Sequence, residues 1–203
     1  MGGRWPAPLG AAAALALLLL ILPNPKAQLF SLHPILMTAA YAALPSLALA
    51  KKKIPGRPNT ILHILLMCTA LLSALVAHFA IFEHKTKLGK PHNKTWHSWC
   101  GLASTLAFAV MCAASLPLLH PDFGVQKTSK RLRTMHRFGG RLVLSLCHLT
   151  MVTGVATLSG YAGTSVALAL VAMSWHQWLI PDQFSSWVYS ARGYTYAYGD
   201  GVV

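Results

Sequence analysis

Residues 96–119 read WHSWCGLASTLAFAVMCAASLPLL, an apolar run without a single Asp, Glu, Lys or Arg. A helix needs about 20 apolar residues to cross the hydrocarbon core of a bilayer, which is roughly 30 Å thick. Because lipid offers the backbone no hydrogen-bond partner, a run of this length and composition favours a transmembrane α-helix. The same pattern recurs along the chain, and it decides the fold class.

Apolar length predicts six transmembrane helices, at residues 5–23, 29–50, 60–82, 96–119, 134–158 and 162–181. The first run has an alternative interpretation as a cleaved signal peptide, because its fully apolar part, 9–22, is short and Arg4 supplies a weak positive start. No convincing cleavage site follows, so it is kept as a helix. We therefore expect an all-α, multi-pass membrane protein with a single domain over residues 1–203, in which helices two to five (about 29–158) form a four-helix bundle.

The composition agrees with a membrane domain. Of the 203 residues, 55% are hydrophobic and only 10% are charged, against roughly 25% charged in soluble domains. The net charge of +13 comes from Lys and Arg in short loops between the apolar runs, so we expect no nucleic-acid partner. All four cysteines lie inside apolar runs without CxxC spacing, and we predict no disulfide framework.

The cations are divided unequally between the two sides of the membrane. With six spans, one side carries both termini and twelve of the 17 cations, namely Arg4, Lys51, Lys52, Lys53, Arg57, Lys127, Lys130, Arg131, Arg133, Arg137, Arg141 and Arg192. The other side carries Lys26, Lys85, Lys87, Lys90 and Lys94. Because loops rich in Lys and Arg stay in the cytosol, both termini are expected to be cytosolic. The sequence leaves the choice between an endomembrane (endoplasmic reticulum or vesicle) and the plasma membrane open.

Four histidines, His33, His63, His97 and His136, each lie near the start of a different predicted span, the second to the fifth. Successive spans run antiparallel, so His33 can meet His97 near one face of the membrane, and His63 can meet His136 near the other. Two histidines on facing helices are a typical ligand set for haem b. The pattern predicts two such sites, roughly 20 Å apart along the membrane normal. One such histidine would be interpreted as helix packing, but four at matched depth favour haem.

Residues one helical turn after each histidine repeat in the same pairs. Gly101 follows His97 and Gly140 follows His136 in the pattern HxxxG, whereas Met37 and Met67 follow the other two in the pattern HxxxM. Each proposed pair therefore joins a glycine helix to a methionine helix, and the glycine would leave room for a porphyrin edge.

The remaining intramembrane histidines are interpreted mainly as packing residues. His78 lies deep in the third predicted span, toward the His33–His97 end. Packing is the preferred interpretation for it, and the alternative is a bond to a haem propionate or a proton relay. His148 is interpreted as a core residue.

Residues 29–37 (LFSLHPILM), 84–90 (HKTKLGK) and 95–97 (TWH), together with the four-histidine layout, resemble the cytochrome b-561 family, and in particular its short transmembrane-reductase branch. The resemblance covers almost the whole chain and weakens after about residue 158. It implies two haem b groups and an ascorbate-dependent transmembrane oxidoreductase. Cytosolic ascorbate would be the electron donor, and monodehydroascorbate or a ferric chelate the acceptor on the other side. Family members commonly form homodimers.

The resemblance also implies substrate sites. Cations near the cytosolic haem would hold the ascorbate anion, and the residues in that region are Lys53, Arg57, Arg131 and Arg133. Ile61 stands where many ascorbate-using members have a second basic residue, so another small anionic reductant stays open. On the other side, Lys90, His92 and Lys94 are candidates for the acceptor site, with a solvated loop as the equal alternative. Arg137 is a candidate partner for a haem propionate, or snorkels to the interface.

The competing hypothesis from another class is a transporter whose histidines bind protons or a metal. Carboxylates usually join such metal sites. The only acidic residues here, Glu83, Asp122, Asp182 and Asp200, lie at span ends or outside them. A haem-free scaffold is a third interpretation, and it would leave four buried histidines without a purpose.

Overall fold

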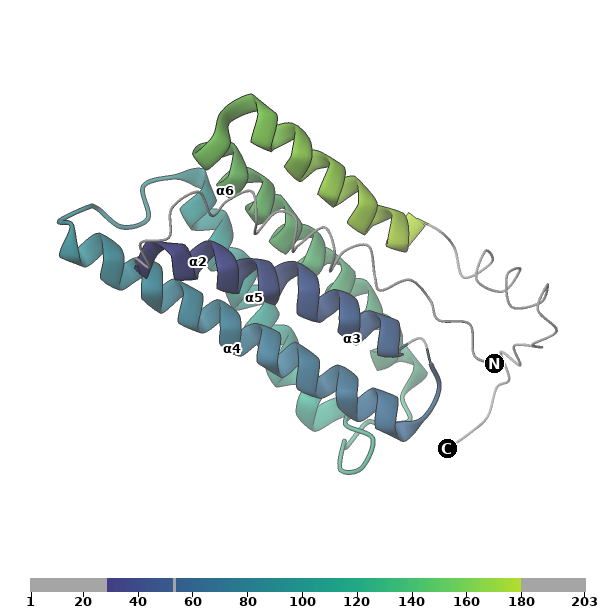
Figure 1. Cartoon of the computed structure of the whole chain (residues 1–203). Helices are drawn as coiled ribbons and strands as arrows, with labels where there is room; N and C mark the ends of the chain where they lie inside the picture. The colour runs from purple at the N-terminus through teal and green to yellow at the C-terminus, as the bar shows by residue number, and fades with distance from the viewer. Residues whose placement is uncertain (1–28, 53, 180–203) are drawn as a thin grey trace.

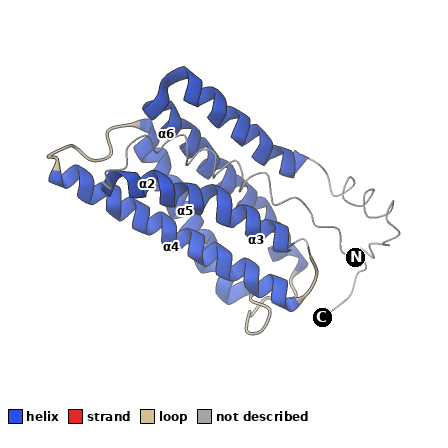
Figure 2. Cartoon of the chain, viewed as in Figure 1, coloured by secondary structure: helices blue, strands red, loops and turns tan. Residues whose placement is uncertain are grey.

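Helices make up all the regular secondary structure in the described residues, 29–52 and 54–179, of the computed structural model (Figures 1 and 2). Side chains are described as far as residue 157. The elements are α2 (Leu29–Thr38), the π-helix η1 (Ala39–Ala43), α3 (Leu44–Lys52), α4 (Arg57–Lys87), α5 (Trp96–Leu119) and α6 (Lys130–Leu179). This confirms the all-α prediction for that part of the chain. The predicted span 5–23 lies outside it.

Four helical stretches in the described region are long and apolar enough to cross a membrane: Leu29–Lys52, Arg57–Lys87, Trp96–Leu119 and Lys130–Thr157. They correspond to the second to fifth predicted spans. The helix α4 begins before and ends after the predicted 60–82, because polar residues such as those at 83–87 continue a helix beyond the hydrocarbon core. Apolar length therefore located the spans better than it located the helix ends.

The predicted fifth and sixth spans, 134–158 and 162–181, fall largely within one assigned helix. Helix α6 runs from Lys130 to Leu179 without a gap in its assignment. The sequence there, Ser159-Gly160-Tyr161, contains no proline, and a Gly/Ser pair permits a sharp kink without ending a helix. In Figure 1 the ribbon of α6 folds back on itself, and its yellow-green arm returns along the bundle.

Helix η1 joins α2 and α3 into one membrane-crossing path, and the π-helix was not predicted. The Leu44 N–H bonds the carbonyl of Ala39, five residues back. The next residue, Pro45, has no N–H, so the Tyr41 carbonyl lacks its ordinary α-helical donor. The freed carbonyl faces the His148 imidazole of α6. Because Pro45 has no N–H, the Tyr41 carbonyl is available for a contact with α6.

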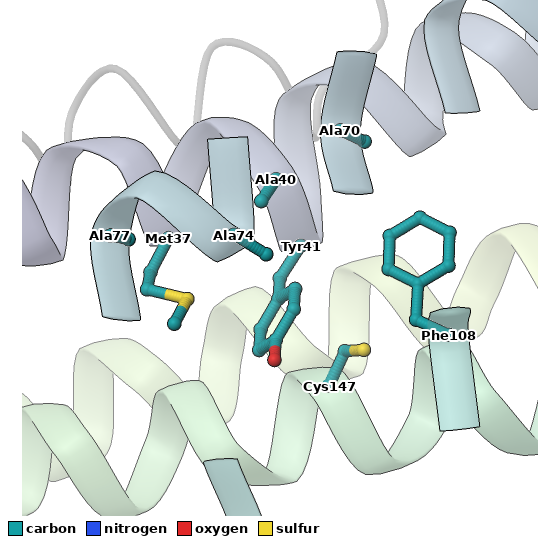
Figure 3. Packing of buried hydrophobic residues seen from close by; sticks show 8 residues of the cluster. All are labelled: Met37, Ala40, Tyr41, Ala70, Ala74, Ala77, Phe108 and Cys147. Carbon is teal, nitrogen blue, oxygen red and sulfur yellow. The ribbon is translucent and has the colours of Figure 1, made fainter. Parts of the chain in front are cut away.

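Small side chains let the helices approach closely in the core. Ala70, Ala74 and Ala77 of α4 are fully buried and pack with Met37 and Tyr41 of the facing path (Figure 3). Close packing of small residues is the usual basis of helix association in lipid, where apolar burial alone gives no driving force. The outward faces carry large apolar side chains suited to contact with lipid.

Candidate haem sites

The four histidines form two pairs at opposite ends of the bundle. The ring centres of His33 (α2) and His97 (α5) lie 6.3 Å apart, with an angle of 83° between the ring planes. The ring centres of His63 (α4) and His136 (α6) lie 6.5 Å apart, at 85°. The structure therefore brings together the same partners that antiparallel topology predicted, and it does not bring sequence neighbours together.

Three of these histidines use Nδ1 to bond a backbone carbonyl of a neighbouring helix. The bonds are His33 to Ala77 (3.0 Å), His63 to Ala48 (3.1 Å) and His97 to Thr150 (3.0 Å). A carbonyl oxygen can only accept, so Nδ1 must carry the proton. The lone pair of each neutral ring is then on Nε2. This is the tautomer that metal-bound histidines use, with the other nitrogen held by a carbonyl.

The fourth histidine, His136, has the same tautomer, but its Nδ1 bonds a side chain. His136 Nδ1 lies 2.8 Å from the Ser115 hydroxyl oxygen. That hydroxyl also bonds the Met111 carbonyl, to which it must donate, so its oxygen accepts from His136. All four histidines thus share one tautomer, and each can offer Nε2 to a metal.

The spacing and the surroundings fit a metal held between each pair. Two metal–nitrogen bonds of about 2 Å, plus roughly an ångström from each nitrogen to its ring centre, put the two ring centres on the order of 6 Å apart. Space is also present beside Gly140, because a Cβ built there would meet no atom within 4 Å. The residues present therefore fit a bis-histidine haem.

Gly154 of α6 is a site residue that sequence reasoning missed. A Cβ at this position would lie 2.7 Å from His97 Cε1, closer than real Cβ contacts. A side chain there would push the imidazole out of its place. A glycine within an apolar span was the only hint that Gly154 has a role. The sequence does not show that α6 turns this residue toward His97. A Cβ built on Gly101 would meet Thr150 Cγ2 at 3.6 Å and His78 Cε1 at 3.7 Å, and the role of Gly101 beside the haem stays a prediction.

The predicted cytosolic cations are spread around one end of the bundle. Arg57 forms a two-pronged ion pair with Asp122, with N–O distances of 2.6 and 2.7 Å. Hydrogen bonding from Arg57 holds the pKa of the Asp122 carboxyl below its usual value. Arg133 donates to the Lys127 carbonyl, and Arg131 is exposed. Lys53 lies outside the described residues.

The other predicted side chains are oriented by contacts of their own. Arg137 donates to the Thr134 hydroxyl at 3.3 Å. His92 stacks on Phe82 with ring centres 4.2 Å apart, and its Nε2 lies 3.3 Å from the Thr86 hydroxyl. The loop is therefore anchored to the end of α4 at His92, whereas Lys90 and Lys94 are exposed.

A bundle of membrane-spanning helices with paired, carbonyl-anchored histidines is the architecture of a membrane-embedded b-type cytochrome. The chain belongs to the eukaryotic cytochrome b561 family, whose model matches residues 32–162, more than half of the chain. Membership implies haem b as the cofactor.

Individual relatives agree with this family. The chain is 30% identical to transmembrane reductase CYB561D2 of Bos taurus over 146 residues, which are 68% of this chain and 66% of that protein. It is 32% identical over 131 residues to transmembrane ascorbate-dependent reductase CYB561 of Ovis aries, covering 62% and 52%. It is 25% identical over 133 residues to lysosomal membrane ascorbate-dependent ferrireductase CYB561A3 of Mus musculus, covering 63% and 55%. The match thus spans just under two thirds, or about half, of the length of these relatives. The resemblance to the transmembrane-reductase branch is confirmed.

Proposed function

We propose that this protein carries electrons across a membrane between two haem b groups, one held by His33 and His97 and the other by His63 and His136. The observation that carries the proposal is the presence of two histidine pairs with matched ring spacing and a common tautomer. The proposal includes six spans with both termini in the cytosol, as the cation distribution predicts.

The chain's own residues would bind and orient the haems. Haem b supplies reversible one-electron chemistry at each site. The Nδ1 bonds hold each ring in a fixed orientation and make Nε2 a stronger electron donor. If both histidines of a pair hold the iron, they would leave no position at which oxygen could bind. Electron transfer from the donor and to the acceptor would then take place at the two membrane surfaces.

We propose ascorbate as the cytosolic donor, supported by the ovine and murine relatives, whose names call them ascorbate-dependent. Lys53, Arg57, Arg131 and Arg133 would attract the anion. Arg57 already holds Asp122, so an anion that uses this guanidinium must compete with that carboxylate.

The proposed acceptor is monodehydroascorbate or a ferric chelate, and the ferrireductase name of the murine relative supports the second. Lys90, His92 and Lys94 are the side chains proposed to meet it. Arg137 would act as an interface residue or as a propionate partner.

The transporter alternative is less well supported. No group of three or more His, Cys, Asp or Glu in the described part of the chain is arranged to hold a metal ion. The family relationship also favours electron transfer.

The test is to purify the full chain in detergent, measure haem per chain, and record reduced-minus-oxidised spectra with ascorbate and with dithionite. Two haem b per chain that ascorbate reduces are expected. Reduction by dithionite alone would reject ascorbate and keep the two-site architecture. Folded protein without haem would overturn the proposal and favour the transporter.

A further inference from the structure

The middle of the bundle holds buried hydroxyl groups that neither histidine pair needs as ligands. The Tyr41 hydroxyl of η1 lies 2.6 Å from the Thr105 hydroxyl and 2.9 Å from the Ser104 hydroxyl, both on α5. Ser104 lies 3.4 Å from the Thr150 hydroxyl of α6. His78 of α4 reaches the Thr105 hydroxyl through Nε2 at 2.7 Å. We call these five residues the Tyr41 cluster.

The direction of these bonds makes Tyr41 a donor to a pair of neighbouring hydroxyls on α5. Ser104 and Thr105 both bond the Gly101 carbonyl, at 3.0 and 2.9 Å, and a hydroxyl bonded to a carbonyl must donate to it. Their oxygens are then acceptors, and the single proton of the Tyr41 O–H goes to one of them, with the shorter contact, 2.6 Å, made to Thr105. Figure 3 shows the Tyr41 side chain extending from its helix toward the facing helices.

The hydroxyl groups of the Tyr41 cluster are buried almost completely. Tyr41 is 1% exposed, Ser104 0%, Thr150 3% and Thr105 5%. Polar groups inside a membrane cost free energy unless they are bonded, and hydroxyls also serve simply as polar contacts between helices. The alanines of α4 show that this bundle can pack closely without them.

The position of the cluster distinguishes it from ordinary helix packing, because both of its ends meet the His33–His97 pair. Thr150, which contacts Ser104 through its side chain, also supplies the carbonyl that bonds His97 Nδ1. At the other end, the His78 ring lies edge-on to His33, with ring centres 6.2 Å apart. The His63–His136 pair is held instead by Ala48 and Ser115.

We propose that Tyr41 is a positioning residue for the His33–His97 haem site, an inference that rests on the proposed function. Its hydroxyl fixes α5 through Ser104 and Thr105. The Ser104 hydroxyl donates to Gly101 and the Thr150 hydroxyl donates to Leu146, so their oxygens meet at 3.4 Å in a packing contact, and this contact sets α6 so that the Thr150 carbonyl meets His97. A well-aligned bond to this carbonyl increases electron donation from His97 to the iron, which stabilises the ferric state. The cluster therefore lowers the reduction potential of one haem and leaves the other unaffected.

The test is the Tyr41→Phe substitution in the full-length, haem-loaded protein, followed by a redox titration that resolves both haems. The variant should keep two haems, and the midpoint potential of one should rise while the other stays within the error of wild type. Thr69→Val is the matched control, because Thr69 is an exposed residue whose hydroxyl bonds the Leu65 carbonyl of its own helix. Ser115→Ala identifies the other haem, since it changes the His63–His136 site alone.

The outcomes separate this inference from the proposed function. Wild-type protein without two haems overturns both. Two haems whose potentials are both unchanged in Tyr41→Phe, or both shifted equally, overturn the positioning role alone. If Tyr41→Phe does not fold, Ser104→Ala removes the link to Thr150 and keeps the tyrosine. It must then raise the potential of the same single haem, and an unchanged potential rejects the inference.

Discussion

The two histidine pairs have nearly equal ring spacing, 6.3 and 6.5 Å, but different supports. The His33–His97 pair is bonded to two backbone carbonyls and adjoins the Tyr41 cluster. The His63–His136 pair is bonded to one carbonyl and one hydroxyl, Ser115. The same ligand geometry is thus reached in a polar surrounding at one end and with a single side-chain hydroxyl at the other. Because second-layer hydrogen bonds tune a haem, we expect two haems with the same ligands and different potentials.

The largest effect is expected from removing one ligand of each pair in turn. His97→Phe and His63→Phe should each halve the haem per chain and remove different components of the reduced-minus-oxidised spectrum, because each pair binds its haem separately. Haem content and spectra of the purified variants check this. His120→Gln is the control, since that ring stacks on Phe123 outside both pairs. Loss of both haems from either folded variant would contradict independent sites.

A smaller but still strong effect is expected at Gly154. Gly154→Ala places a Cβ 2.7 Å from His97 Cε1, so the imidazole must shift and haem should be lost or loosened at the His33–His97 site only. Alanine favours a helix over glycine by about 1 kcal/mol, so any loss is steric and does not come from helix propensity. Gly139→Ala is the control, because its Cβ would meet only the flexible Met111 side chain, at 3.3 Å from sulfur. Equal haem retention in both variants would argue that His97 has room to move.

The next effect tests the His63–His136 pair, in which the acceptor at Ser115 is a side chain that substitution can delete. Ser115→Ala leaves the His136 Nδ1–H without its acceptor, at a cost of about 1–3 kcal/mol for an unpaired buried donor. We expect a lower Tm and a higher midpoint potential for one haem. Ser73→Ala, which removes a hydroxyl bonded to the Thr69 carbonyl of its own helix, should change neither. A shift in the haem that responds to Tyr41→Phe would show that the two supports are not separate.

The sequence was sufficient to predict which histidines meet, because their depth in each span and the alternation of helix direction decide it. It also located α5 correctly at both ends, where Thr95 caps the first turn by accepting from the Ser98 N–H. At the other end, His120 precedes Pro121, and a residue before proline is disfavoured in helical conformation.

The Nδ1 partners, Gly154 and the Tyr41 cluster could not be predicted in the same way. They depend on how each helix is rotated about its own axis, and a π-helix changes that rotation within a single span. The sequence between 158 and 162 likewise did not show that one assigned helix, α6, would cover the region of both predicted spans. The haem-ligand role of the four histidines stays a prediction until haem is measured.

The smallest effect concerns Arg57 and Asp122 at the cytosolic end. Both side chains are exposed to solvent, so their ion pair should contribute little to stability. The Asp122 pKa is lowered, chiefly by the Arg57 hydrogen bond, so the contribution is present above the usual carboxyl pKa of about 4 and is lost as the pH falls through the lowered value. The Tm difference between wild type and Asp122→Asn should therefore be small at pH 7 and vanish in acid.

If Arg57 binds the reductant, the same substitution frees its guanidinium, and half-maximal haem reduction should require less ascorbate. Asp122→Asn protein with unchanged ascorbate dependence would remove Arg57 from the donor site and leave both histidine pairs as proposed.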